Sequence, residues 1–412
     1  MLNLLNQTSL PLPGNGNLTS MPANMAEALA LVREGRLQEA TDLLMGHTKD
    51  GATAAADAIQ TPSQPSARMT GLAARGLASV QDVLSKLDLR AADMSVPPAG
   101  ADATFEHRSG PDAQAAEPSA SAPGRFERVA FTHGGASHPY FLYTPKTAAP
   151  PGGRPLVLML HGCTQDAQDF AQGTRMNATA EAAGALVLYP TQSQNANPNG
   201  CWNWFRPEDQ QAGAGEPALL RAMLQHAMDA HGVDDERVFV AGLSAGGAMA
   251  AVLAQQYPDV FAAVGVHSGL PPGAATNMMG ALSAMKSGAK GWRAPPAKGG
   301  ARAVPMIVLH GDADKTVNHR NAEQLLRSAT AGIATTVQSQ EHCVSSDGQR
   351  YTRTCVIDPA APGEVVAEHW LLHGAGHAWS GGDARGSHTS ARGVDASAEM
   401  LRFFLANPGD DR

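Results

Sequence analysis

The sequence predicts an α/β fold in which a mainly parallel sheet is flanked by helices. Short apolar runs alternate with longer helix-like stretches from residue 125 to residue 405, which is the pattern of consecutive βαβ units. The run at residues 156–160, Leu-Val-Leu-Met-Leu, is apolar throughout, as expected of a strand buried on both faces. Such sheets bind ligands beyond the carboxyl ends of their strands, so functional residues are expected there.

The composition limits the classes of partner. Hydrophobic residues make up 43% of the chain and charged residues 17%, which suits a soluble globular protein. The 38 acidic residues outnumber the 30 basic ones, and the net charge of −8 argues against nucleic acid or a polybasic membrane surface. No apolar run reaches the length of about 18 residues that a membrane span needs. The first residues lack the basic and apolar segments of a secretory signal.

Two parts are expected along the chain. Residues 1–124 form an N-terminal extension with helices at residues 25–44 and 71–89, and their Ala-, Pro-, Ser- and Gly-rich flanks predict disordered or linker segments. These helices could bind a partner or a hydrophobic particle, or the region could be a poorly ordered extension. Residues 125–412 form the main domain.

Each element of the main domain is predicted from its local pattern. The first two strands are expected to pair antiparallel and to open the sheet, and Pro190 and Pro258 end a strand and a helix. The expected strands are residues 125–132, 140–143, 156–160, 185–189, 238–241, 261–266, 306–309 and 368–372. The expected helices are residues 166–183, 216–231, 248–256, 318–330 and 394–405.

The main domain contains the pattern Gly242-Leu-Ser244-Ala-Gly246 between a predicted strand and a predicted helix. This strand–turn–helix setting is that of a nucleophile elbow. A serine hydroxyl is a weak nucleophile, so it must be held clear of the sheet beside a base. The tight turn leaves no room for side chains at its flanks, hence Gly242 and Gly246. The backbone amide of Ala245, at the start of the helix, can donate to a developing oxyanion.

The other candidate catalytic residues each follow a predicted strand. Asp314 and Asp312 compete for the acid that orients a histidine; Asp314 lies deeper in its loop, whereas Asp312 is better placed to cap the turn, so Asp314 is preferred. His377 lies on the loop after the last predicted strand and is the expected base. The order Ser244, Asp314, His377 is that of α/β-hydrolases.

A second oxyanion donor is expected after residues 156–160, where His161-Gly-Cys-Thr164 follows. The backbone amide of Cys163 is the preferred donor, although His161 and Gly162 could simply shape a turn. Trp202 and Trp204 lie in a polar, turn-rich stretch, and Trp379 lies beside the base, so these three are expected to form a substrate groove; the alternative is packing against the domain. His267 and Ser268 follow another strand and are interpreted as site-lining or structural.

Neither a metal nor a cofactor is expected. His369, His373 and His377 recur every four residues, but Gly374 and Gly376 argue against a helical metal stripe, and no H-E-x-x-H pattern occurs. The four cysteines, which allow three pairings and have no zinc-site spacing, are Cys163, Cys201, Cys343 and Cys355. A clip between the last two, across a turn-like segment, is plausible. Disulfides would indicate an oxidising compartment, whereas the missing signal argues the other way.

Five motifs taken together resemble one family; they are His161-Gly-Cys-Thr-Gln165, Asn199-Gly-Cys-Trp-Asn-Trp204, Gly242-Leu-Ser-Ala-Gly-Gly247, His310-Gly-Asp-Ala-Asp314 and Gly376-His-Ala-Trp379. Over residues 126–406 the chain resembles the poly(3-hydroxybutyrate) depolymerase family of esterases, which includes feruloyl- and acetylxylan-esterase-like members. The resemblance implies an α/β-hydrolase with nucleophile Ser244, acid Asp314 and base His377. It also implies a Cys163–Cys201 disulfide that holds the Trp202 loop near the oxyanion turn.

The expected function is therefore hydrolysis of ester bonds in poly(3-hydroxybutyrate) or its oligomers through an acyl-enzyme. One alternative is a feruloyl- or acetylxylan-type carboxylesterase, and another is a granule-binding protein with a secondary hydrolase role. The N-terminal extension resembles the intracellular branch of the family, which works on storage granules. A cytoplasmic or granule-associated location is expected, with non-classical secretion as the alternative, and the polymer granule surface is a candidate partner.

Overall fold

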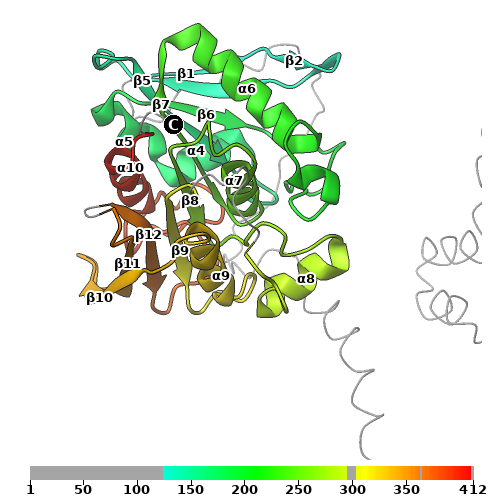
Figure 1. Cartoon of the computed structure of the whole chain (residues 1–412). Helices are drawn as coiled ribbons and strands as arrows, with labels where there is room; N and C mark the ends of the chain where they lie inside the picture. The colour runs from blue at the N-terminus through cyan, green and yellow to red at the C-terminus, as the bar shows by residue number, and fades with distance from the viewer. Residues whose placement is uncertain (1–123, 295–302, 362–363, 410–412) are drawn as a thin grey trace, which may run out of the picture. The chain divides into compact units, whose positions relative to one another are not determined.

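The computed structural model describes residues 124–294, 303–361 and 364–409 (Figure 1). Within these residues, ten strands form one sheet in the order β1-β4-β6-β5-β7-β8-β9-β12-β11-β10. The six strands from β6 to β12 are parallel to one another, and both edges of the sheet are antiparallel. This is the predicted α/β fold with a mainly parallel sheet.

The strands of this sheet are β1 (Arg125–Val129), β4 (Tyr140–Thr144), β5 (Arg154–Leu160), β6 (Leu186–Pro190), β7 (Val233–Leu243), β8 (Ala263–His267), β9 (Met306–Gly311), β10 (Val337–Val344), β11 (Arg350–Ile357) and β12 (Val365–Leu372). A two-stranded ribbon, β2 (Thr132–His133) and β3 (Ala136–Ser137), connects β1 to β4. The predicted antiparallel pair that opens the sheet is confirmed as β1 and β4.

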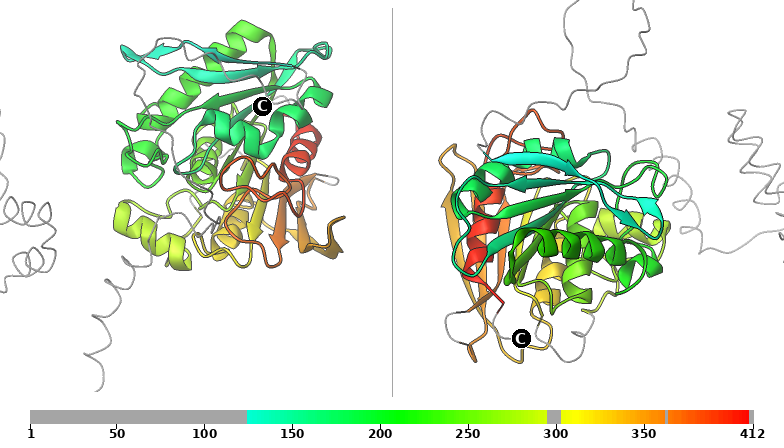
Figure 2. Two further views of the ribbon diagram at one scale, coloured as in Figure 1. Left: turned by 180° about the vertical axis from the view of Figure 1, so that it is seen from behind. Right: turned by 90° about the horizontal axis from the view of Figure 1, so that it is seen from above.

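Helices cover both faces of the sheet (Figures 1 and 2). One face carries α6 (Gly215–His231), α7 (Ala245–Gln256), α8 (Met278–Ser287) and α9 (Arg320–Ala329), and the other carries α4 (Ala167–Thr174), α5 (Met176–Ala183) and α10 (Ala396–Ala406). Strand β5 shows why both faces are needed. Leu158 and Leu160 join the first core and Val157 and Met159 join the second, because successive side chains point to opposite faces.

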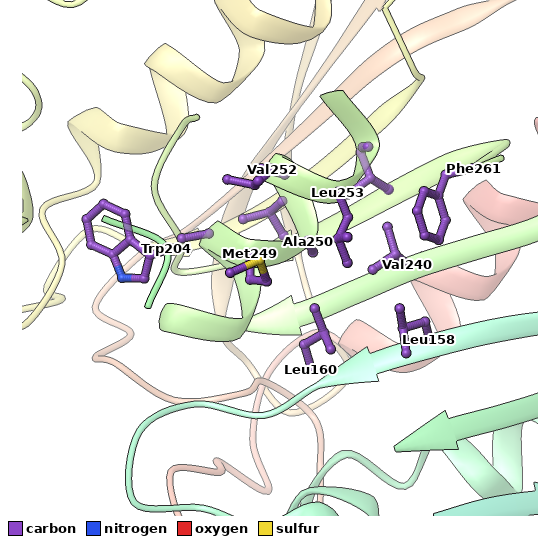
Figure 3. Packing of buried hydrophobic residues seen from close by; sticks show 14 of the residues in the cluster. Leu158, Leu160, Trp204, Val240, Met249, Ala250, Val252, Leu253 and Phe261 are labelled. Carbon is purple, nitrogen blue, oxygen red and sulfur yellow. The ribbon is translucent and has the colours of Figure 1, made fainter. Parts of the chain in front are cut away.

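Helix α7 is deeply buried near the site. Met249, Ala250 and Leu253 pack on Leu158 and Val240 of the central strands (Figure 3). Burying an aliphatic side chain of this size contributes about 1.5–3 kcal/mol, before conformational entropy is subtracted. The helix that follows the expected nucleophile is thus held rigidly by the core.

One expected helix is in fact two. Residues 166–183 were expected to be continuous, but α4 ends at Thr174, Arg175 adopts φ 56°, and α5 begins at Met176. The physical reason is a close tertiary contact just before the break. An added Cβ at Gly173 would lie 2.5 Å from Thr389 Oγ1, and the Gly173 carbonyl accepts the amide hydrogen of Asp383 at 2.8 Å.

The elements that were not predicted are α8, β10, β11, the short β2–β3 ribbon and a 3₁₀ helix at Pro207–Gln210. Strand β10 is exposed along nearly its whole length and reads Val-Gln-Ser-Gln-Glu-His-Cys-Val, so it carries no alternation of apolar and polar residues. The expected helices at residues 25–44 and 71–89, and the rest of the expected N-terminal extension at residues 1–124, lie outside the described residues except for Gly124. That division of the chain stays a prediction.

Candidate active site

Ser244 lies at the sharp turn between β7 and α7. Its backbone adopts φ 56° and ψ −117°, a strained conformation for a residue with a side chain. Its amide donates to the His267 carbonyl at 2.9 Å, so the neighbouring strand fixes the turn. An added Cβ at Gly246 would lie 2.0 Å from the Leu160 carbonyl oxygen, and one at Gly242 would lie 2.4 Å from Gly246. Both glycines are needed for the close approach that the motif predicted.

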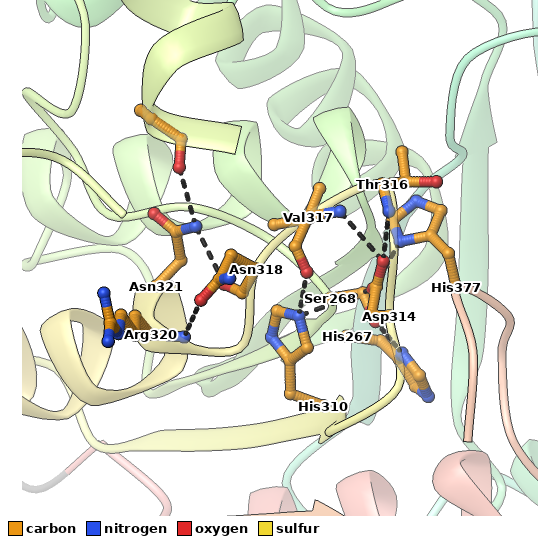
Figure 4. Close-up of polar contacts among 11 residues, drawn as sticks. His267, Ser268, His310, Asp314, Thr316, Val317, Asn318, Arg320, Asn321 and His377 are labelled. Atoms are coloured by element: carbon orange, nitrogen blue, oxygen red, sulfur yellow. Dashed lines mark hydrogen bonds and ion pairs between the residues drawn. The ribbon is translucent and has the colours of Figure 1, made fainter. Parts of the chain in front are cut away.

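Asp314 and His377 are joined directly. His377 Nδ1 lies 2.6 Å from Asp314 Oδ2, so the ring donates from Nδ1 and leaves Nε2 as a hydrogen-bond acceptor (Figure 4). The two loops that carry these residues are also linked by the backbone, because the Ala313 amide donates to the Ala375 carbonyl at 3.1 Å. This bond is the arrangement by which an acid fixes the tautomer and orientation of a base.

The Asp314 carboxylate is held by three hydrogen-bond donors. Its Oδ1 accepts from the amides of Thr316 and Val317, each at 2.8 Å (Figure 4). Its Oδ2 is bonded to His377 and also lies 3.4 Å from His310 Nε2, a nitrogen whose own hydrogen bond goes to the Val317 carbonyl at 2.8 Å. Burial raises the pKa of Asp314, but the nearby His310 ring and the hydrogen bonds from His377 and the Val317 amide outweigh it and hold the pKa well below its usual range. Asp314 is therefore an anion at any ordinary pH.

The competing acid, Asp312, contacts a different histidine. His373 Nδ1 lies 2.8 Å from Asp312 Oδ2, and the Gly374 amide donates to Asp312 Oδ1 at 2.7 Å. The preference for Asp314 over Asp312 therefore agrees with the geometry: Asp314 reaches His377, whereas Asp312 fastens the turn that begins the His377 loop. The serine is not in the same hydrogen-bonded chain: within the described residues, no hydrogen bond joins Ser244 Oγ to His377. Such bonds are often long in uncomplexed hydrolases.

The turn after β5 lies against the nucleophile. An added Cβ at Gly162 would lie 3.6 Å from Ser244 Cβ, so the residue that precedes Cys163 in the chain packs directly on the nucleophile. His161 shapes this turn from within the core: its Nδ1 donates to the Gly162 carbonyl at 2.8 Å and its Nε2 accepts from the Gln192 amide at 3.1 Å. Burial lowers the pKa of His161, which keeps the ring neutral.

The disulfide implied by the resemblance is present. Cys163 and Cys201 are bonded and thus tie the turn at residues 161–164, which carries the expected oxyanion donor and is called the oxyanion turn below, to the Trp202 segment. The two segments are joined by the backbone as well, since the Thr164 amide donates to the Asn199 carbonyl at 2.8 Å. The loop after β5 and the loop after β6 therefore form one unit at the carboxyl edge of the sheet.

The prediction of a disulfide between Cys343 and Cys355 is wrong, although β10 and β11 do form an antiparallel hairpin. Both cysteines are free thiols. In the antiparallel register of β10 and β11, Cys343 lies opposite Tyr351 and Cys355 lies opposite Ser339. The cysteines are therefore offset by four residues along the strands, or about 13 Å at the rise of a β-strand, which is too far for a disulfide.

The three tryptophans expected to line a groove are buried. Trp202 is 1% exposed, Trp204 6% and Trp379 0%. Trp202 packs against His161, and Trp379 stacks on His267 with ring centroids 5.3 Å apart. Side chains with so little exposed surface cannot line an open groove. The burial therefore favours the alternative interpretation, in which these tryptophans pack against the body of the domain.

His267 connects the nucleophile to the loop of the base. Its carbonyl accepts from the Ser244 amide, and its ring Nε2 accepts from the Ser380 amide at 3.2 Å. Nδ1 lies 3.2 Å from Ser268 Oγ. Burial lowers the pKa of His267 to about 3, aided by the nearby rings of His310 and His377, so this histidine stays neutral. A structural role was one of the two interpretations given for His267 and Ser268.

Two functional contacts were missed from the sequence. His310 stood in a quoted motif, but nothing in its spacing indicated that its ring would lie beside the Asp314 carboxylate. Glu216, at the start of α6, is a buried carboxylate that holds the loop after β6. Only its place at a helix start could have singled it out, because acidic residues are common there.

The histidines that recur every four residues do not form a metal site. Residues 124–294, 303–361 and 364–409 contain no group of three or more His, Cys, Asp or Glu side chains arranged to hold a metal ion. His373 and His377 each face their own aspartate, and His369 Nε2 is buried without a hydrogen-bond partner. No described helix has the length and apolar character needed to cross a bilayer.

Comparison with known proteins identifies the family of the segment that contains Ser244 and Asp314. The family model described as esterase PHB depolymerase matches residues 138–337. Poly(3-hydroxyalkanoate) depolymerase C of Paucimonas lemoignei is 36% identical over 195 residues, which are 44% of this chain and 45% of the relative. Feruloyl esterase B of Neurospora crassa is 31% identical over 205 residues, covering 45% of this chain and 67% of the relative.

Among solved structures, an acetyl xylan esterase from Aspergillus awamori superposes with a TM-score of 0.52 at 20% identity, covering 69% of this chain and 100% of that chain. This likeness supports the α/β-hydrolase fold. The chain spans less than half the length of the two bacterial depolymerases it matches, 45% for Paucimonas lemoignei and 32% for Ralstonia pickettii. The elbow, the fold and the matched segment together show that the chain belongs to the esterase PHB depolymerase family.

Proposed function

We propose that this protein is a serine carboxylesterase that hydrolyses ester bonds of poly(3-hydroxybutyrate) or its oligomers through an acyl-enzyme. The observation that carries the proposal is the 2.6 Å bond between His377 Nδ1 and Asp314 Oδ2, in a fold that presents Ser244 at a strained elbow. The substrate class is supported by the two bacterial relatives, which are named as depolymerases of poly(3-hydroxyalkanoate) and poly(3-hydroxybutyrate).

In the first half of the reaction, Ser244 Oγ attacks the ester carbonyl carbon while His377 Nε2 takes the hydroxyl proton. The carbonyl oxygen becomes an oxyanion that accepts hydrogen bonds from the amides of Cys163 and Ala245. Asp314 stays ionised and stabilises the imidazolium. The tetrahedral intermediate then collapses, and the leaving alcohol oxygen receives the proton from His377.

In the second half, a water molecule attacks the acyl carbon of the ester on Ser244 and gives a proton to His377. The second intermediate uses the same two amides. Its collapse breaks the bond to Ser244 Oγ, which takes back the proton and leaves a free 3-hydroxy acid or a shortened oligomer. No redox step or group carrier enters this scheme.

The decisive experiment measures release of 3-hydroxybutyrate monomer or oligomers from amorphous poly(3-hydroxybutyrate) granules, with a generic short-chain ester assayed in parallel. The wild-type protein is expected to hydrolyse both. Ser244→Ala should abolish both activities while its circular dichroism spectrum and melting temperature stay close to those of the wild type. An active, well-folded Ser244→Ala protein would refute the assignment of Ser244 as the nucleophile.

A second candidate is an esterase for feruloyl or acetyl groups on plant polysaccharide. It is supported by the fungal relatives named feruloyl esterase B and probable acetylxylan esterase A, of which Aspergillus fumigatus has one at 25% identity over 247 residues. Methyl ferulate and acetylated xylan separate the candidates. Hydrolysis of either at a higher kcat/KM than a hydroxybutyrate oligomer would replace the polyester proposal with this one and leave the mechanism unchanged.

The location and the granule contact are part of the same proposal. We infer a cytoplasmic or granule-associated protein, because the N-terminal extension resembles that of the branch of the family that works on storage granules. The Cys163–Cys201 disulfide argues instead for an oxidising compartment, so non-classical secretion is the competing location. Sedimentation of the full chain with isolated granules tests the contact. Binding that persists in Ser244→Ala and is lost on removal of residues 1–124 would support the granule-binding role of the N-terminal extension; equal binding without those residues would refute it.

A further inference from the structure

Glu216 is a buried carboxylate that the proposed mechanism does not use. It is the second residue of α6 and only 8% exposed. Burial, aided by the nearby Asp209 carboxylate, raises the pKa of Glu216 to about 7. A carboxylate kept from water in this way destabilises the fold unless its oxygens are hydrogen-bonded, so its partners indicate what it is for.

The partners of Glu216 belong to two separate loop segments. Oε1 accepts from Gln192 Nε2 at 2.5 Å and from Asn203 Nδ2 at 2.6 Å. Oε2 accepts from the Asn203 backbone amide at 2.7 Å. Gln192 follows β6, and Asn203 lies in the Cys-Trp-Asn-Trp stretch. One carboxylate therefore fastens both segments, and all three of its partners are donors.

Both segments lead to the oxyanion turn. Gln192 Nε2 also donates to the Cys201 carbonyl at 3.1 Å, and the Gln192 amide donates to His161 Nε2 at 3.1 Å. Asn203 holds the chain two residues beyond Cys201. Cys201 is bonded to Cys163, so the carboxylate secures the anchor of the proposed oxyanion donor from both sides.

We propose that Glu216 is a positioning residue, which by holding Gln192 and Asn203 fixes the Cys201 segment and, through the disulfide, the Cys163 amide beside Ser244. The inference rests on the proposed function, since the Cys163 amide matters only if it stabilises an oxyanion there. Removing one oxyanion donor costs about 10²–10³ in kcat in serine hydrolases, and misplacing it costs part of that.

The protonation state of Glu216 should matter in one direction. The carboxylate accepts from all three donors, whereas the protonated acid has to give up one of them. All three hydrogen bonds to Glu216 are therefore expected above about pH 7, the value to which burial raises the pKa of this residue, and fewer of them below it. The titratable groups around Glu216 are Asp209, whose Oδ1 accepts from the Glu216 amide at 2.8 Å, and, farther out, Glu208, Arg206 and His161.

The test uses the full chain with Glu216→Gln, Glu216→Ala, Gln192→Ala and the double variant that combines the two alanine substitutions. In Glu216→Gln the new side chain keeps the size and one oxygen acceptor but turns an amide donor toward the Asn203 amide, so it breaks one bond without leaving a cavity. The matched control is Glu181→Ala. Glu181 also accepts several hydrogen bonds, from the Tyr143 hydroxyl at 2.6 Å and the Thr147 amide at 3.1 Å, but it fastens the end of β4.

Glu216→Ala is expected to lower kcat on the short ester about 10- to 100-fold with little change in KM, because the donor acts in the transition state. The double alanine variant should lose no more than the worse single variant, because both residues act through the same segment. The ratio of wild-type kcat to Glu216→Gln kcat should rise with pH through about 7, because every ionisable group that the two proteins share affects both rates alike. Glu181→Ala should keep the wild-type kcat.

The inference is overturned if Glu216→Gln and Glu216→Ala keep the wild-type kcat, or if the pH ratio is flat while only the melting temperature falls, which is what a purely structural carboxylate would give. Glu216→Gln keeps the test valid if the alanine variant fails to fold. The proposed function is judged separately, by wild-type hydrolysis and its loss in Ser244→Ala. A wild-type protein without ester hydrolysis would overturn both.

Discussion

The Asp314 carboxylate shows how the structure separates two neighbouring acids with similar sequence settings. Asp314 is buried, receives hydrogen bonds from two backbone amides and from His377, and lies beside the His310 ring, whereas Asp312 is about one-third exposed and pairs with His373. Buried charges depend on their partners, while exposed ion pairs contribute about 1 kcal/mol or less. The two positions should therefore respond very differently to loss of charge.

Asp314→Asn is expected to lower kcat about 10³- to 10⁴-fold on the short ester, because His377 loses the anion that fixes its tautomer and stabilises its charged form. Steady-state kinetics measure the loss, with circular dichroism to verify the fold. Asp312→Asn is the matched control and should cost less than about tenfold, as it removes only a partly exposed pair. Equal losses at the two positions would contradict the assignment of the acid.

At the scale of elements, the strand–turn–helix unit β7–Ser244–α7 requires the backbone at Gly246 to pass very close to the backbone at the end of β5. Gly246 passes so close to β5 that an added Cβ would lie 2.0 Å from the Leu160 carbonyl oxygen and 2.5 Å from that of His161. Both are backbone atoms in the centre of the sheet, so they cannot move aside as a flexible side chain would.

Gly246→Ala is therefore expected to destabilise the protein by about 3 kcal/mol or more, the upper end for overpacked sites, or to prevent folding. Urea denaturation and soluble yield measure this. Gly280→Ala in α8 is the control: its added Cβ would meet only ordinary contacts at 3.5 Å or more, and alanine favours a helix over glycine by about 1 kcal/mol. A Gly246→Ala protein as stable as the control would show that the elbow is looser than described.

The disulfide is the second element that links the sheet to the site. It joins cysteines 38 residues apart, and the stretch between them includes α4, α5 and β6. Cys201→Ser is expected to lower the free energy of unfolding by about 2–4 kcal/mol and to lower kcat more than KM changes, since the oxyanion turn loses its anchor. Denaturation curves and kinetics check both effects. Cys355→Ser, which removes a free thiol, should change stability by about 1 kcal/mol or less.

At the scale of the whole molecule, buried neutral histidines set the response to acid. Burial lowers the pKa of His267 to about 3 and that of His369 to about 4. In the unfolded chain the same groups titrate near a pKa of about 6.5. Between about pH 6.5 and pH 4 these two histidines therefore bind more protons in the unfolded state than in the folded state, and their contribution to stability falls as the pH falls. Glu216, whose pKa burial raises to about 7, makes one contribution of opposite sign in the same window.

The expected size is about 1.4 kcal/mol per pH unit for each histidine that stays neutral, within that window. Urea denaturation at several pH values from about 7.5 to 4.5 measures the slope. His369→Gln removes one such histidine outside the candidate site. It should reduce the slope of the free energy of unfolding against pH by about 1.4 kcal/mol per pH unit. If its slope equals that of the wild type, His369 is protonated in the folded state and the assignment of a neutral buried ring fails.

The fold was largely predictable where one pattern determines one element. The apolar runs of β5, β6 and β9 admit no other placement than the sheet interior, and the elbow motif predicted the sharp turn at Ser244. Prediction failed where a tertiary contact decides. Arg175 breaks α4 from α5 because a distant loop packs on Gly173, and the polar strand β10 exists only because β11 pairs with it.

By itself, the sequence determined the α/β class, the order of the strands that carry functional residues, and the residue types that can act as nucleophile, acid and base, because these follow from local periodicity and motif spacing. Only the tertiary structure decided which aspartate reaches His377, that the tryptophans are buried, that Cys343 and Cys355 are out of register, and that Glu216 holds the loop after β6. These are contacts between segments far apart in the chain, and their distances depend on how the strands are ordered and aligned in the sheet.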